Sequence, residues 1–112
     1  MRIGDVVEVD LGQPTGSEAG FVRPSVLVVA DAFLRYRPSV VFVVPLTSTR
    51  RDFPSHIAIA ADRDNGLTTA SWAQVEQLRS VSTRRCRTPL GNVGAIVVAQ
   101  ILDVIAMITG IS

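Results

Sequence analysis

Apolar residues occur in short alternating or continuous runs over the first sixty residues of the chain, a pattern typical of β-strands. Within residues 3–11, two valines alternate with two acidic residues, the period-two pattern of a half-exposed strand. The continuous runs at 25–29 and 39–45 are rich in valine and indicate buried strands, and residues 56–60 form a shorter run. Residues 31–36 interrupt this pattern and favour one helical turn. We therefore predict a mainly β protein.

The second half of the chain has weaker strand signals and one strong helix signal. Alternation over residues 71–78 predicts a further strand, and residues 90–93 predict a short one, with a polar turn at 62–66 and a basic turn at 84–87. Residues 95–108 are apolar on nearly every side of a helix, and a glycine flanks the run at each end. We predict a long helix here. Because a helix that is apolar on most sides must bury more than one of them, we also expect a homodimer.

The segment between the first two predicted strands, residues 12–22, is a long loop that contains Gly16 and Gly20. A loop of this length in so small a chain is usually functional, and its glycines favour irregular backbone. We therefore expect the loop to act as a mobile lid over a neighbouring site. Arg23 follows the loop at the mouth of the next strand. We expect that strand to begin near Pro24, because proline has no backbone N–H to donate.

Length, composition and charge then limit the class of protein. The chain has 112 residues, of which 47% are hydrophobic and 19% charged, so we expect residues 1–112 to form a single globular domain. The net charge of +1 excludes a global electrostatic attraction for nucleic acid. All 11 basic residues are nevertheless arginines. The planar guanidinium group suits bidentate contacts with phosphate better than the lysine ammonium does.

The single cysteine, Cys86, excludes an intramolecular disulfide and fits a reducing cytoplasm. Arg85 and Arg87 flank it, an arrangement that can lower the pKa of a thiol, although an unreactive thiol is the alternative. Acidic residues precede any apolar stretch at the N-terminus, so we expect no signal peptide. The apolar run at 95–108 is too short and too interrupted to span a bilayer. We therefore expect a cytoplasmic protein that does not enter the membrane.

Several enzyme classes are excluded because their motifs are missing. His56 is the only histidine, so there is no Ser-His-Asp set, and the sequence has no CxxC or HExxH pattern for a metal ion. It also has no glycine-rich loop that matches a P-loop. These observations disfavour kinases, zinc hydrolases and dinucleotide-binding enzymes, and we expect neither a metal nor a cofactor.

The remaining residues that can perform chemistry lie in the long loop and at predicted strand ends. They are Ser17, Glu18, Arg23, Thr47, Ser48 and Thr49. A cation, several hydroxyl groups and one carboxylate are sufficient for RNA transesterification, because RNA carries its own nucleophile in the 2′-hydroxyl. The protein need only orient the RNA, move protons and stabilise the charge on the phosphorane-like transition state. For any one of the hydroxyl residues, a purely structural place in a turn is the alternative.

Four segments, in order and at matching spacing, resemble the MazF/PemK toxins, the sequence-specific endoribonucleases (mRNA interferases) of type II toxin–antitoxin systems. The four segments are the RIGDVVEVDL of residues 2–11, the Gly-Ser-Glu of residues 16–18 together with Arg23 and Pro24, the VPLTST of residues 44–49, and the EQLRSV of residues 76–81. The second is the most specific of the four. Together they cover nearly the whole chain.

The resemblance implies a mainly β (α+β) fold, an SH3-like small barrel of strongly bent antiparallel sheet with a C-terminal helix. It implies a homodimer that binds single-stranded RNA (mRNA) in a groove along the dimer interface. Cleavage would need no metal and would leave a 2′,3′-cyclic phosphate and a 5′-hydroxyl. A cognate MazE-like antitoxin would inhibit by placing its C-terminal segment in the same groove.

The resemblance also implies roles for individual residues. The catalytic residues of the family fall on Arg23 and Thr47, with Glu18 as a carboxylate in the loop. The residues that we expect to bind RNA are Ser17, Gly20, Phe21, Ser48, Thr49, Gln77 and Arg79. The chain departs from the family at Ser25, where an apolar residue is usual. It departs again at Trp72, which replaces an aliphatic residue and is either part of the core or a platform for base stacking.

Two other functions remain open. The CcdB-like toxins that bind gyrase share this fold, and a fold alone does not determine function. A catalytically silent binding module on the same fold is the other alternative. Arg23 and Thr47 favour the endoribonuclease, because a gyrase-binding toxin would not need both at these positions. Neither the recognised RNA sequence nor the identity of the antitoxin follows from the chain.

Overall fold

The computed structural model describes residues 1–111. Its strands are β1 (Asp5–Asp10), β2 (Val22–Leu27), β3 (Val40–Thr47), β4 (His56–Ile59), β5 (Ser71–Gln74), β6 (Arg79–Ser82) and β7 (Cys86–Asn92). Its helices are α1 (Asp31–Leu34) and α2 (Gly94–Thr109), and two 3-10 turns are η1 (Val75–Gln77) and η2 (Thr83–Arg85). The predicted strand at 39–45, the turn of helix at 31–36 and the long helix at 95–108 are confirmed.

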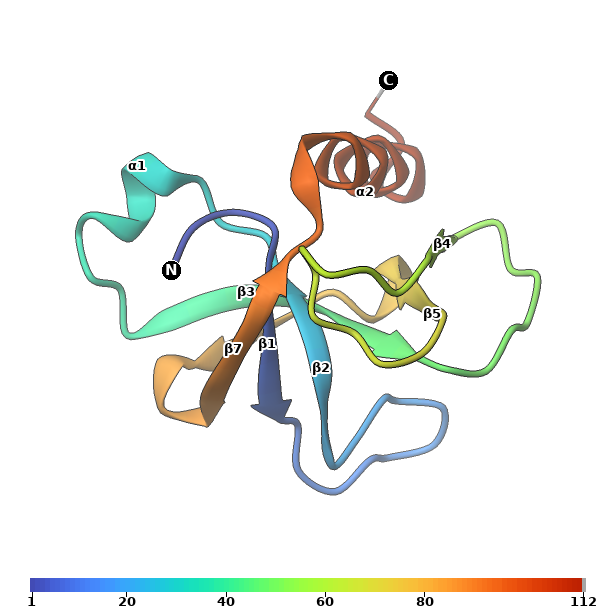
Figure 1. Cartoon of the computed structure of the whole chain (residues 1–112), viewed down its shortest axis with the longest axis horizontal. Helices are drawn as coiled ribbons and strands as arrows, with labels where there is room; N and C mark the ends of the chain where they lie inside the picture. The colour runs from blue at the N-terminus through green and yellow to red at the C-terminus, as the bar shows by residue number, and fades with distance from the viewer. Residues whose placement is uncertain (112) are drawn as a thin grey trace.

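Within residues 1–111, seven strands form one antiparallel sheet in the order β4-β5-β3-β2-β1-β7, and β6 pairs with β3. One edge of β3 pairs with β2, while the other edge pairs first with β6 and then with β5. This arrangement bends the sheet strongly (Figure 1). The order ends with β4 on one side and β7 on the other, so the sheet is not closed into a barrel. The predicted fold class is otherwise confirmed.

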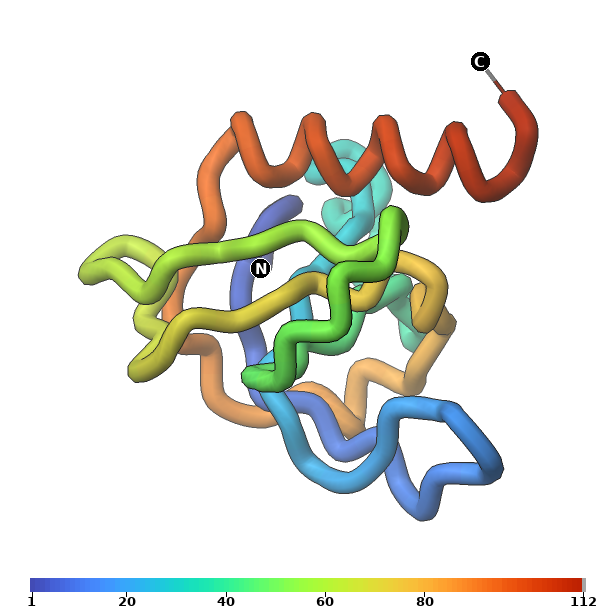
Figure 2. The backbone as a smooth tube through the Cα atoms, turned by 90° about the vertical axis from the view of Figure 1, so that its right-hand side faces the viewer, coloured from blue at the N-terminus to red at the C-terminus, as the bar shows by residue number. Residues whose placement is uncertain are grey.

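Both faces of the central strands are covered, which explains why their sequences are nearly continuously apolar. One cluster of buried side chains includes Val7, Val9 and Leu27, and lies on one face. The second cluster includes Val6 and Ile101, and joins the other face to α2. Figure 2 shows α2 across this end of the sheet, with the β1–β2 loop at the opposite end. The described residues contain no helix with the length and apolar character needed to cross a membrane.

α2 buries only part of its apolar surface against the sheet. Ile101 is buried, whereas Ile96 on another side of the helix is 78% exposed. Other exposed apolar side chains of α2 are Leu102, Met107 and Ile108. The helix ends at Gly110, which has the left-handed φ of 76° that a glycine tolerates best. A remaining apolar surface on α2 is therefore available for a further partner.

The predicted start of the second strand is wrong. β2 begins at Val22, and Arg23 and Pro24 already pair with Val9 and Glu8 of β1. Proline is tolerated there because β2 begins to pair with β3 only at the next residue, Ser25. Arg23 is consequently fixed within the sheet rather than carried on a flexible approach to it.

The predicted strand over residues 71–78 is wrong in its second half. Its first four residues form β5, but residues 75–77 form η1, and the chain returns to an extended form only in β6. The pairings of Ala73 with Leu46 and of Arg79 with Val43 leave five residues opposite two residues of β3. The surplus length closes into a turn, as in an extended β-bulge.

The short strand predicted at 90–93 is much longer, because β7 begins at Cys86. Only part of the basic turn predicted at 84–87 is a turn, namely η2. The other edge of β1 needs a partner, and β7 follows it from Cys86 opposite Val9 to Asn92 opposite Asp5, with two register irregularities. A long-range pairing therefore overrides the weak local strand tendency of these residues.

Candidate functional site

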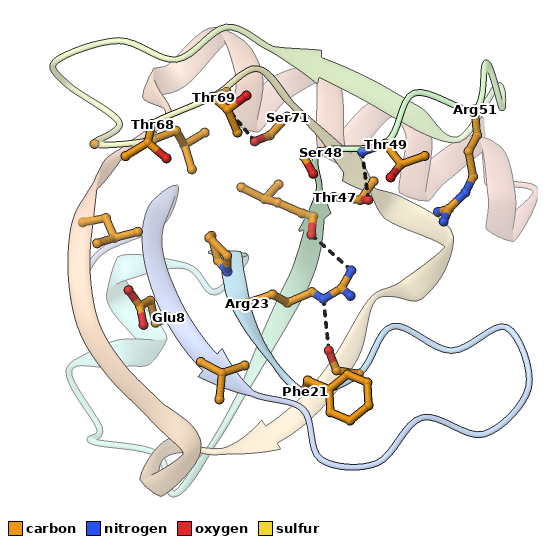
Figure 3. A pocket seen from close by; sticks show the side chains of 17 residues that line it. Glu8, Phe21, Arg23, Thr47, Ser48, Thr49, Arg51, Thr68, Thr69 and Ser71 are labelled. Carbon is orange, nitrogen blue, oxygen red and sulfur yellow. Dashed lines mark hydrogen bonds between the residues drawn. The ribbon is translucent and has the colours of Figure 1, made fainter.

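A pocket of about 710 Å³ opens where the β1–β2 loop, the start of β2 and the end of β3 meet (Figure 3). Its lining includes Gly20, Phe21, Arg23, Thr47, Ser48, Thr49 and Arg51, and on other sides Glu8, Thr68, Thr69 and Ser71. The strand pairing explains this composition, because it brings the start of β2 next to β1 and the end of β3 next to β5. Segments far apart in the sequence thus form one concave surface with both polar and apolar side chains.

Arg23 projects into this pocket from β2 and is fixed there by three hydrogen bonds. Its Nε donates to the carbonyl of Gly20 at 3.1 Å, and its Nη1 donates to the carbonyl of Leu46 at 3.4 Å. The same Nη1 donates to Oε1 of the buried Gln74 at 3.5 Å. All three acceptors are uncharged. None of the ion pairs in the described part of the chain involves Arg23.

The electrostatic surroundings of Arg23 favour an anion. Burial, and then the positive charge of nearby Arg51, lower the pKa of the Arg23 guanidinium from its ordinary value. The group still carries its charge at neutral pH. A partly desolvated cation without a carboxylate partner is stabilised when an anionic ligand binds. The pocket therefore suits a phosphate group.

Hydroxyl groups surround the space in front of Arg23. Thr47 ends β3, and its Oγ1 accepts a hydrogen bond from the amide of Thr49 at 3.1 Å, which leaves its proton free to donate. Ser48 and Thr49 also line the pocket, as we expected for residues that bind RNA. Figure 3 shows Thr47 beside the Arg23 guanidinium. A phosphate bound to Arg23 would thus meet hydroxyl donors.

Five residues of the lining with polar side chains were not predicted from the sequence: Glu8, Arg51, Thr68, Thr69 and Ser71. Glu8 is the one carboxylate among the described residues that line the pocket. The sequence pattern could have indicated this residue, because the alternation in the first strand places Glu8 on the face opposite to that of Val7 and Val9. Arg51 follows the predicted group Thr47–Thr49 by two residues, whereas nothing local marked Thr68, Thr69 and Ser71, which come close through the pairing of β5 with β3.

The β1–β2 loop supplies Gly20 and Phe21 to the pocket, whereas Ser17 and Glu18 lie outside its lining. Glu18 instead accepts a hydrogen bond from the amide of Thr15 at 2.9 Å, within the loop. Phe21 has a positive φ of 61°, a costly conformation for a bulky side chain. The carbonyl of Gly20, one residue earlier, is the acceptor for Arg23. The loop backbone therefore helps to position the arginine.

The segment 74–77 forms hydrogen bonds with Arg23, with the β1–β2 loop and with the start of β4. Gln74 accepts from Arg23, as described above, and Gln77 contacts the loop by donating to the Ser17 carbonyl at 2.9 Å and accepting from the Ala19 amide at 3.1 Å. Glu76 accepts from Ser55 at 2.8 Å and lies 3.0 Å from Nε2 of His56. Gln77 thus contacts the loop rather than the pocket.

Three other residues that the sequence singled out lie away from the pocket. Arg79 donates to the carbonyl of Leu11 at 3.3 Å, at the base of the loop. Ser25 is fully buried, and its hydroxyl has no hydrogen-bond partner among the described residues. Burial raises the pKa of the Cys86 thiol, which favours the unreactive thiol over the alternative of a lowered pKa. The flanking arginines do not compensate for that desolvation.

Known proteins are similar to this chain in sequence and in fold. The family model of the PemK-like, MazF-like toxins of type II toxin–antitoxin systems matches residues 2–109. The chain is 38% identical over 106 residues to Endoribonuclease MazF9 of Mycobacterium tuberculosis, which covers 90% of this chain and 89% of that protein.

Solved structures with the same fold include MazF (Form-I) from Deinococcus radiodurans, with a TM-score of 0.82, 21% identity, and coverage of 98% of this chain and 96% of that one. Another is an endoribonuclease in complex with its cognate antitoxin from Mycobacterial species. For that structure the TM-score is 0.78 and the identity 23%, with coverage of 100% of this chain and 97% of the other.

Proposed function

The chain belongs to the PemK-like, MazF-like toxins of type II toxin–antitoxin systems and is an endoribonuclease, and from this premise we propose that it cuts single-stranded RNA in the Arg23 pocket. The cleavage needs no metal ion and leaves a 2′,3′-cyclic phosphate and a 5′-hydroxyl. One observation carries the proposal: a partly buried arginine without a carboxylate partner faces an open pocket beside several hydroxyl groups.

In this mechanism the RNA 2′-oxygen attacks the adjacent phosphorus, and the bond from phosphorus to the 5′-oxygen breaks. Arg23 stabilises the extra negative charge on the phosphorane-like transition state. Thr47 donates a hydrogen bond from its hydroxyl to a phosphate oxygen and orients the group for attack. The leaving 5′-oxygen takes up a proton from Arg23 or from water.

The 2′-hydroxyl must lose its proton to a base, and two carboxylates are candidates. Glu8 lies in the pocket lining, whereas Glu18 reaches the pocket only if the β1–β2 loop moves. We predict that Glu18 acts in catalysis, as the family resemblance implies. A comparison of Glu18→Gln with Glu8→Gln tests this prediction: loss of kcat in Glu18→Gln alone supports it, and loss in Glu8→Gln alone assigns the base to Glu8.

The experiment that tests the proposed function is incubation of the pure protein with a long single-stranded RNA in excess EDTA. We expect discrete cuts whose upstream fragments end in a cyclic phosphate. The Arg23→Ala variant, prepared in parallel, excludes a contaminating nuclease if its RNA stays intact. Intact RNA with the wild-type protein would contradict the proposal, and trapping of gyrase in the same samples would support a CcdB-like toxin.

We also propose that residues 1–112 act as one toxin domain in the cytoplasm, as a homodimer inhibited by a cognate MazE-like antitoxin. The exposed Ile96 and Leu102 on α2 support a dimer, because burying each such side chain contributes about 1.5–3 kcal/mol before the costs of association. Sedimentation equilibrium at low micromolar concentration tests it. A monomer that cleaves RNA at full rate would contradict the need for a dimeric groove, and Leu102→Glu shows whether α2 takes part.

A further inference from the structure

A second pocket, of about 480 Å³, lies on the far side of β5 from the Arg23 site. Its lining consists of Arg50, Asp52, Phe53, His56, Ala58 and Trp72. These residues come from the β3–β4 connection, β4 and β5. The pocket therefore combines two aromatic rings with an arginine, outside the site already described.

Strand register places the two pockets next to each other. Trp72 of β5 pairs with Thr47 of β3 on one side and with Ala58 of β4 on the other. Side chains of directly paired residues stand on the same face of a sheet, with Cβ atoms about 4.5–5.5 Å apart. Trp72 consequently stands beside Thr47, and one row of side chains leads from the Arg23 pocket into the second pocket.

A second row of side chains, from Gln74 to His56, runs parallel to the row that contains Thr47 and Trp72. Gln74 accepts a hydrogen bond from Arg23 and pairs across the sheet with His56, which lines the second pocket. The chain after β3 follows the same direction, since Arg51 lines the first pocket and its neighbour Arg50 lines the second. An RNA strand whose phosphate sits at Arg23 therefore has the second pocket, with Phe53 and Trp72, next to it along these two rows.

The side chains of the second pocket suit an unpaired base. Phe53 is 51% exposed, and its ring lies edge-on to His56 with the centroids 5.0 Å apart. Arg50 forms an ion pair with Asp52 at 2.7 Å, but both side chains are largely solvent-exposed, so the pair contributes little and Arg50 can exchange it for a phosphate. Bases of single-stranded RNA stack on aromatic rings, and each such contact contributes about 1–3 kcal/mol.

The floor of the second pocket is formed by a buried histidine that is held in place by a carboxylate. The His56 side chain is only 1% exposed, and its Nε2 lies 3.0 Å from the Glu76 carboxylate, which also accepts from Ser55. The Nδ1 of His56 is buried and has no hydrogen-bond partner in the part of the chain that the structure describes. A ligand that binds here therefore meets one side chain, His56, that is already fixed, so no conformational freedom of this residue is lost on binding.

We propose that the second pocket binds the base of the nucleotide next to the scissile phosphate, which stacks on Phe53 and Trp72 while Arg50 contacts the adjoining phosphate. This inference rests on the proposed function, since it assumes that RNA is cut at Arg23. It makes Phe53 and Trp72 binding residues and determinants of sequence preference. The β3–β4 connection would then read the RNA together with the β1–β2 loop.

The first experiment uses Trp72, the only tryptophan of the chain, as a fluorescent reporter inside the pocket. The probe is a short RNA that spans a mapped cut, with a 2′-deoxy nucleotide at the attacking position so that it binds without being cleaved. We expect a saturable change in Trp72 fluorescence. Probes with an abasic ribose on one or the other side of the cut identify the nucleotide: one of them should bind about 5- to 150-fold more weakly and lose the fluorescence change.

The second experiment compares two matched variants. Phe53→Ala should raise KM for RNA about 5- to 150-fold and leave kcat at saturating RNA unchanged. Phe33→Ala is the control, because Phe33 is 52% exposed on α1, away from both pockets, and should change neither constant. Arg50→Ala should reduce the slope of log Kd against log salt by about 0.7, as for one lost phosphate contact with single-stranded RNA.

The outcomes separate this inference from the proposed function. If the protein cuts RNA in EDTA but neither abasic probe weakens binding and Phe53→Ala keeps the wild-type KM, the inference is wrong and the endoribonuclease assignment stands. If no RNA is cut, both are wrong. The abasic probes need only the wild-type protein, so they give an answer even if Phe53→Ala fails to fold.

Discussion

The fold buries the polar residue Asn65 fully and Arg23 partly, and the two differ in how their hydrogen-bonding groups are satisfied. Asn65 is 2% exposed, and its Nδ2 donates to the Ala60 carbonyl at 2.8 Å. Its Oδ1 accepts from the amides of Asp62 at 3.1 Å and Leu67 at 3.0 Å. Three hydrogen bonds thus hold this side chain inside one turn between β4 and β5.

Arg23 forms longer hydrogen bonds, of 3.1 to 3.5 Å, to uncharged acceptors, and its charge has no partner among the ion pairs of residues 1–111. Burial lowers its pKa, so the fold disfavours the charged form that it nevertheless keeps. The comparison shows how a structural polar group differs from a functional one. A structural polar group forms its hydrogen bonds within the fold, whereas the charge of a functional one has no partner until a ligand binds.

The most direct test of this comparison is to remove the positive charge of Arg23. Arg23→Ala should lower the rate of RNA cleavage about 10²–10⁴-fold, because the transition-state charge loses its main partner. The thermal midpoint should change little, since the lost hydrogen bonds are long. Cleavage assays and calorimetry measure the two effects. Arg23→Lys should recover little activity, as the planar fork is lost, and a wild-type rate in Arg23→Ala would contradict the role of Arg23.

The opposite result is expected for Asn65. Asn65→Ala should lower the free energy of unfolding by about 1–3 kcal/mol, because it leaves buried backbone groups without partners. Its kcat per folded molecule should stay within about twofold of wild type. Asn65→Asp is the matched control: it keeps the acceptor for Asp62 and Leu67 but loses the donor to Ala60, so denaturant unfolding should give an intermediate value. A large loss of kcat with normal stability would make Asn65 functional.

The β1–β2 loop contains an amide that is hydrogen-bonded to another part of the fold and amides that we expect to be protected only by a ligand. Hydrogen exchange can distinguish the two. The Ala19 amide is bonded to Gln77, so Gln77→Ala should speed its exchange about 2- to 13-fold, for the loss of about 0.5–1.5 kcal/mol. The amides of Gln13, Gly16 and Ser17 should exchange fast in the free protein and become protected when RNA binds, as in a lid. Equal, strong protection with and without RNA would show that the loop is not a lid.

The smallest expected effect is the contribution of Glu76 to the free energy of unfolding at acidic pH. Burial by itself raises the pKa of the Glu76 carboxyl, but hydrogen bonds with His56 and Ser55 outweigh it, so the pKa is lowered from its ordinary value of 4.5. A lowered folded-state pKa stabilises the protein above pH 4.5, and this contribution is lost as the pH falls through the folded value.

Since Glu76 is partly exposed, the loss should be below about 1 kcal/mol. Urea titrations from pH 6 to pH 3 measure it, with Glu76→Gln as the control, in which the acid-side decrease should be shallower. Identical pH dependence of the two proteins would show that Glu76 makes no net contribution.

The sequence by itself determined the elements whose signal is local. The valines of 40–44 make β3 a strand in any context, and the apolar run between Gly94 and Gly110 is long enough to form α2 despite its β-branched residues. The same is true of Arg23 and Thr47, which the resemblance of two sequence segments to the family assigns to one site. They lie together in the pocket because β2 and β3 are neighbours in the sheet.

Only the tertiary structure decided where elements stop and which distant residues meet. β2 reaches back to Val22 because β1 pairs with it, and the run 71–78 breaks at Val75 because β3 offers too few partners to keep it extended. Glu8 and Thr69 join the pocket for the same reason. Strand pairing brings together residues that are far apart in sequence, and the free energy of such contacts depends on the partner, which no local pattern contains.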